Sequence, residues 1–203
     1  MLADLDRSVA AFLDRLLPAG TVIRFGQPDA SWSGGSLLDA FMYDIRETRP
    51  PAIDGTLTRD ADGRATGWQP PVRHYQVSYL LTGWPDTGTN GHELLSGVLV
   101  GCAVAGFIPD DCLHGTLAEA GEPVPVACAG QEPACEAARI WPHLGIPART
   151  ALDLMVIAPV VPPLDAELAP VVRSVNLGAH HDPDEARTGE KRAPRPEHRI
   201  TEA

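Results

Sequence analysis

The chain has 203 residues, of which 44% are hydrophobic, and its formal net charge is -11 with an isoelectric point near 4.9. This length fits one domain of about 150 to 180 residues with appendages, and the apolar content is sufficient for a core. The acidic balance argues against a nucleic-acid partner, because binding to a phosphate backbone needs clustered Lys and Arg.

The first predicted elements are one helix and two strands. Apolar residues recur at steps of three and four over residues 2–17, which indicates an amphipathic helix. A short strand is predicted over 21–25, before a turn rich in Gly, Pro and Asp. Alternating apolar side chains predict a second strand over 37–47, and the acidic residues Asp39 and Asp44 interrupt that alternation.

The longest segment with strand character covers residues 74–84, after an irregular, turn-rich stretch that holds a possible hairpin at 61–64. Its apolar residues share one face, and mostly polar residues occupy the other. We therefore expect a strand that is buried on one face and partly exposed to solvent on the other. Such a strand forms the centre of a sheet or a surface for pairing with another chain.

The remaining segments alternate between helix and strand. In order, they predict a helix over 92–102, a helical turn over 109–113, a Pro-rich extension over 123–127, a helix over 135–144, a strand over 150–158 and a strand arm over 171–177. Residues 179–203 form a polar tail that cannot bury enough surface to fold alone. The fold class predicted for residues 1–178 is α+β, with a mixed, largely antiparallel sheet against which an N-terminal helix and one further main helix pack.

Motifs that carry chemistry are incomplete in this sequence. His92 and Glu93 begin the zinc-protease pattern H-E-x-x-H, but Ser96 occupies the position of the second His. The serines match no nucleophile elbow, and the glycines match no phosphate loop. The run His180-His181-Asp182 is interpreted as a solvated charged segment. No catalytic residue, cofactor or metal is predicted, and the enzyme alternative is a site assembled from Asp44, Glu47 and His74 in a common pocket.

Cysteine usage and the N-terminus give two further expectations. The four cysteines lack zinc-site spacing. A disulfide between Cys128 and Cys135 is geometrically possible, although cytoplasmic thiols normally stay reduced. Acidic residues at the N-terminus argue against a signal peptide, so synthesis and assembly are expected in the cytoplasm. The uncharged run Leu94–Ile108 is shorter than the roughly 20 residues that cross a bilayer, and a buried helix is the better interpretation.

Four blocks of the sequence, spread in order over residues 1–177, resemble the cap, or tail-terminator, family of phage-tail-like contractile injection systems. The blocks are Leu16-Leu17-Pro18 at the end of the first helix, Leu38 to Glu47, Val77 to Trp84 and Ala151 to Pro159. The segment with His92, Leu94, Leu95 and Val98 fits between them.

The resemblance implies a structural, non-enzymatic role. A terminator is a six-membered ring of identical subunits on the end of the inner tube and sheath distal to the baseplate, where it ends polymerisation. The implied partners are the chain itself, the inner tube protein and the sheath protein, within a particle and without membrane insertion. The alternative is another tube-end or baseplate component of the same machine. The candidate interface is the strand arm, with Val171, Val172, Arg173, Val175 and Leu177.

Overall fold

The computed structural model describes residues 1–29, 31–32, 35–48, 55–84, 90–129, 137–164, 175–176 and 199–200. It divides into two compact units, one of Met1–Thr56 with Gln69–Pro163 and one of Leu57–Trp68 with Leu164–Ala203. Residue 178, where the predicted domain ends, lies outside the described residues, so that boundary stays a prediction.

Helix α1 covers Leu2–Asp14 and packs its apolar stripe into the core of the first unit. The stripe is formed by buried Leu5, Val9, Phe12 and Leu13, as the three-and-four spacing predicts. The helix ends earlier than residue 17 because Pro18 disfavours helical geometry at the preceding residue and supplies no N–H.

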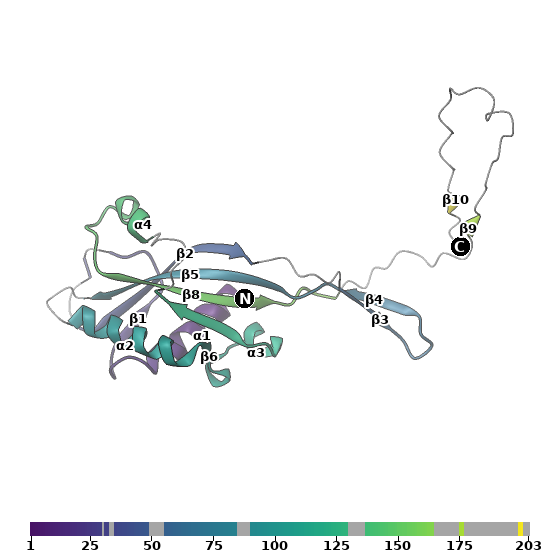
Figure 1. Ribbon diagram of the computed structural model, residues 1–203, viewed down its shortest axis with the longest axis horizontal. Helices are drawn as coiled ribbons and strands as arrows, with labels where there is room; N and C mark the ends of the chain where they lie inside the picture. The colour runs from purple at the N-terminus through teal and green to yellow at the C-terminus, as the bar shows by residue number, and fades with distance from the viewer. Residues whose placement is uncertain are drawn as a thin grey trace, which may run out of the picture. The chain divides into compact units, whose positions relative to one another are not determined.

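The core of the first unit is a six-stranded sheet (Figure 1) with the strand order β1-β2-β5-β8-β7-β6. The bounds are β1 Val22–Arg24, β2 Leu37–Glu47, β5 Arg73–Trp84, β8 Ala151–Val160, β7 Val124–Cys128 and β6 Phe107–Ile108. Strand β1 runs parallel to β2, and the other pairs are antiparallel. The predicted α+β class with a mixed, largely antiparallel sheet is confirmed.

Strand β5 is the centre of the sheet, as predicted, but its second face is buried rather than partly exposed to solvent. It pairs with β2 on one side and with β8 on the other. From Val77 to Trp84 every residue is buried, including the polar Ser78 and Thr82. The physical reason is a second apolar cluster on that face, in which Leu80 packs with Trp141. The Thr82 hydroxyl accepts a hydrogen bond from the indole of Trp84 at 2.9 Å, which offsets the cost of burying it.

Helices cover both faces of the sheet. Helix α1 and helix α2 (Asn90–Ala105) contribute to the main cluster on one side, and α4 (Ala137–Leu144) carries Trp141 to the other (Figure 1). The start of α2 lies very close to β5, since a Cβ on Gly83 would stand 2.7 Å from the Cα of Gly91. Glycine at position 83 is therefore required by space.

Short elements complete the first unit. The predicted helical turn is η1 (Asp110–Cys112), and α3 (Thr116–Ala120) was not predicted. The polar side of α1 holds this region in place, because the Asp4 carboxylate accepts a hydrogen bond from the Thr116 hydroxyl at 2.9 Å and Ser8 accepts one from the backbone N–H of His114, also at 2.9 Å. The hydrogen bonds that Asp4 accepts from the hydroxyl and the backbone N–H of Thr116 hold the pKa of Asp4 below its usual range, the hydroxyl contributing most.

The second unit contains two small antiparallel pairs. Strands β3 (Thr56–Arg59) and β4 (Ala65–Gln69) form the predicted hairpin, and the Asp60 carboxylate accepts the backbone N–H groups of Asp62 and Arg64 to fix its turn. The other pair joins β9 (Val175–Asn176) to β10 (Arg199–Ile200), with Val175 opposite Ile200. Part of the predicted arm therefore pairs with the end of the same chain.

Candidate assembly interface

The sheet has two short edge strands and one long open edge. Strand β1 pairs with β2 only over Leu37–Asp39. In the described part of the chain, no strand lies against the outer edge of β2 from Ala40 to Glu47. Backbone N–H and C=O groups at such edges can be completed by another chain. The edges are thus compatible with an assembly protein.

Helix α2 carries the most exposed apolar surface among the described residues. Its inner side buries Leu94, Leu95, Val98 and Cys102. Its outer side, continued by β6, exposes Leu99, Val100, Val104 and Phe107, at 42%, 64%, 84% and 51% of their surface. We name these four residues the α2–β6 patch. The prediction of a buried helix is wrong for this outer side, because the uncharged run reflects an exposed apolar surface as well as a buried one.

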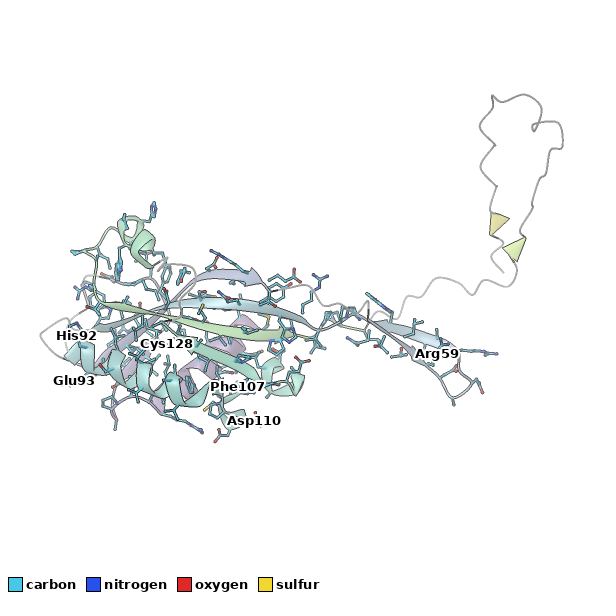
Figure 2. All side chains as sticks on the ribbon, in the orientation of Figure 1. Arg59, His92, Glu93, Phe107, Asp110 and Cys128 are labelled. Carbon is cyan, nitrogen blue, oxygen red and sulfur yellow. The ribbon has the colours of Figure 1, made fainter. Side chains whose placement is uncertain are left out.

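Acidic groups flank the α2–β6 patch at its two ends. Figure 2 shows His92 and Glu93 at the start of α2, with Phe107 and Asp110 near its other end. Both acidic residues are exposed. Beside the patch, a cavity of about 420 Å³ is lined by His92, Leu95, Ser96, Leu99, Thr150 and Leu152. The His92 Nε2 lies 3.1 Å from the Thr150 hydroxyl across it.

The three residues of the enzyme alternative are not brought together as a catalytic group. Each is engaged by a different partner within 2.6 to 2.8 Å: Asp44 by Arg46, Glu47 by Arg73 and His74 by Glu122. They lie along two neighbouring strands, and none of them lines the cavity beside α2. Ion pairs of this kind, half exposed, stabilise strand ends modestly.

The predicted arm residues can be placed only in part. Val171, Val172, Arg173 and Leu177 lie outside the described residues, as does the His180-His181-Asp182 run. Val175 belongs to β9. Cys128 is a free thiol, and Cys135 again lies outside the description.

The described residues hold no group of three or more His, Cys, Asp or Glu side chains that could bind a metal ion. None of the helices described in the chain is both long and apolar enough to cross a bilayer.

Sequence reasoning missed a buried polar cluster at the β1–β2 end of the sheet. Asp39 is completely buried, and within the described residues neither of its carboxylate oxygens has a well-formed hydrogen bond. Burial raises its pKa to about 7, and the nearby charge of Arg24 offsets this only in part. The guanidinium of Arg149 stacks 3.8 Å from the ring of Trp84, which contacts Trp32 edge-on. The only sequence signal was the acid that interrupts an apolar alternation.

Comparison with known proteins tests the predicted resemblance. No curated protein matches the sequence. The structure is similar to the sheath/tube terminator of an extracellular contractile injection system, PVC, in its extended state, with a TM-score of 0.61 and 18% identity over 92% of this chain and 67% of that one. It is also similar to the tube-terminating cap of the anti-feeding prophage, with a TM-score of 0.62 and 19% identity over 88% of this chain and 62% of that one.

The chain thus spans about two thirds of the length of these two structures, and the likeness is one of fold. The family model described as the Pvc16 N-terminal domain matches residues 4–174, most of the sequence. The predicted resemblance to the cap or tail-terminator family is confirmed, and this chain belongs to the Pvc16 N-terminal domain family.

Proposed function

We propose that this protein is the tail terminator of a contractile injection system. Six copies form a ring on the baseplate-distal end of the inner tube and sheath, end their polymerisation and stabilise the extended particle. The observation that supports this most strongly is the family match over residues 4–174, joined by the fold shared with two terminator caps. Synthesis and assembly take place in the cytoplasm.

A terminator has to bind the exposed surface of the last ring of tube and sheath subunits without offering an equivalent surface to which a further ring could bind. Open strand edges and exposed apolar surface suit the first half of this task. The separate engagement of Asp44, Glu47 and His74 in ion pairs suits a binding protein rather than an enzyme. The inner tube protein and the sheath protein are the proposed partners.

The C-terminal arm is the proposed attachment element. Residues 171–177, with Val171, Val172, Arg173, Val175 and Leu177, extend to a neighbouring subunit or to the last sheath ring and pair there as a strand. Among the described residues, the β9–β10 pair joins two residues of each segment, so little of the pairing described there has to be released for the arm to bind elsewhere.

The test is electron microscopy of particles from a strain that lacks the protein. Particles should be missing, abnormally long or prematurely contracted, and the gene supplied in trans should restore them. Gold labelling of a tagged chain should mark the end distal to the baseplate. Particles of wild-type length in the deletion strain would refute the terminator role, and labelling at the baseplate would favour the alternative component.

A further inference from the structure

The α2–β6 patch is unusual for its position and for the exposure of its four side chains. Val104 is 84% exposed although it lies in the last turn of a helix whose opposite side is fully buried. The helix therefore needs none of this outer apolar surface to hold its place in the fold. Contiguous exposed apolar surface on a folded domain typically marks a contact with another molecule.

The charges around the patch restrict what can bind it. Exposed Asp110 follows the patch directly, and exposed Glu93 precedes it (Figure 2). No ion pair involving either residue is found in the described part of the chain. A partner surface with an apolar side chain next to a cationic one would complement both the apolar patch and the acidic residues beside it.

Strand β1 offers such a surface on the same chain. Val22 and Arg24 are two residues apart, and hence on one face of the strand, and both are exposed, Val22 at 52%. The strand is the terminal one in the sheet order, opposite in that order to β6. The Arg24 guanidinium lies 5.4 Å from the ring of Trp32, which restricts its orientation.

We propose that the α2–β6 patch of one copy docks onto β1 of the next copy. Val22 packs against Val104 and Phe107, and Arg24 faces Asp110. The contact is heterologous, since the two surfaces differ, and repeated contacts of this type close a ring. This inference rests on the ring assembly proposed above and adds the surfaces that form it.

Net charge supports a second copy placed in this way. Two chains that each carry a formal charge of -11 repel one another over most of their surfaces. The uncharged stretch from Leu94 to Pro109 supplies the patch, and β1 presents a cation. Contact at these two surfaces therefore reduces the local repulsion and adds an attraction.

The test uses the full-length chain with Val104→Lys, which removes the apolar contact with Val22 and places a cation on the side of β1 that carries Arg24. Lysine is a better helix former than valine, so the fold should be retained. Exposed Ala118 on α3 provides the matched control, Ala118→Lys. Self-association is measured by analytical ultracentrifugation, and rings on particle ends are counted by electron microscopy.

Val104→Lys should raise the concentration for half-association more than about tenfold, since a buried valine is lost, and Ala118→Lys should change it less than twofold. Arg24→Asp and Asp110→Arg should each raise it about threefold to tenfold, and the two together should restore it. Intact rings in Val104→Lys, or no restoration by the exchanged charges, would overturn this inference and leave the terminator role standing.

Two further outcomes separate the proposals. If Val104→Lys forms normal rings in solution that no longer attach to particles, the patch binds tube or sheath and the second copy is refuted as its occupant. If the wild-type chain forms no rings in solution or on particles, both proposals fail together.

Discussion

Replacing the buried Asp39 by asparagine should make the protein more stable at alkaline pH. The side chain keeps its shape in Asp39→Asn, but it can no longer become an anion. Asp39 is completely buried, with no well-formed hydrogen bond to its carboxylate within the described residues. The ionised form is therefore the costly one.

The magnitude follows from the pKa. Burial raises the pKa of Asp39 from 3.8 to about 7, and each pKa unit corresponds to about 1.4 kcal/mol, so the total is about 4 kcal/mol as an upper bound. Because the folded pKa lies above the unfolded one, the folded chain holds a proton that the unfolded chain releases. The free energy of unfolding therefore falls as pH rises from about 4 to 7, and about 3 kcal/mol of this loss lies between pH 5 and pH 8.5.

The assay is urea unfolding of the wild type and the variant at pH 5, 7 and 8.5, followed by circular dichroism. The wild type should lose stability over this range, and Asp39→Asn should lose about 3 kcal/mol less. Asp14→Asn is the control, because Asp14 is exposed at the end of α1 and its replacement removes the same formal charge. It should follow the wild-type pH dependence.

Parallel loss of stability by the wild type and Asp39→Asn between pH 5 and pH 8.5 would refute the reasoning. It would mean that water or a rearranged Arg24 solvates the carboxylate in the folded protein. If Asp39→Asn is less stable than the wild type at pH 5 but still loses about 3 kcal/mol less between pH 5 and pH 8.5, the asparagine amide is itself poorly accommodated and the reasoning on pH stands.

Two other changes have expected outcomes. Gly83→Ala should lower the free energy of unfolding by about 1 to 3 kcal/mol, because the new Cβ would meet the backbone of α2. Gly26→Ala is the control: no atom lies within 4 Å of its new Cβ, so the free energy of unfolding should change by no more than about 0.5 kcal/mol. Equal effects of the two substitutions in urea unfolding would contradict this. Truncation after Pro170 should leave a folded domain with reduced attachment to particles, since several strand hydrogen bonds of about 0.5 to 1.5 kcal/mol each are lost. Truncation after Gly178, which keeps the strand arm, should reduce attachment less. Wild-type occupancy of particle ends after the Pro170 truncation would show that the arm contributes nothing.

The elements with strong periodicity could be predicted from the sequence. Helix α1 and strands β2, β5 and β8 were found because their apolar residues repeat over long segments. Helix α3 was missed because five residues are too few to show a helical period. Strand β7 was interpreted as a Pro-rich extension, since Pro125 obscures the alternation of the buried Val124 and Val126.

The candidate interface was harder to predict than the fold. Periodicity identifies the side of a helix that packs, but the run from Leu94 to Ile108 is uncharged on all sides, so it gave no sign that Val104 is exposed. The burial of Ser78 and Thr82 likewise depends on the apolar cluster with Trp141, which lies distant in sequence. Such features arise from tertiary packing, and a local pattern does not contain them.

The arrangement of β5 between β2 and β8 has a consequence for protein synthesis. Strands β2 and β5 leave the ribosome early, but β8 follows only after α2, α3, β7 and α4 have been made. At about 5 to 20 residues per second, one edge of β5 stays uncovered for about 3 to 13 seconds. A nascent chain in that interval exposes a long apolar strand edge, which is where aggregation begins. The yield of soluble protein should therefore depend on the speed of translation between residues 85 and 150, and chaperones that hold the growing chain should raise it.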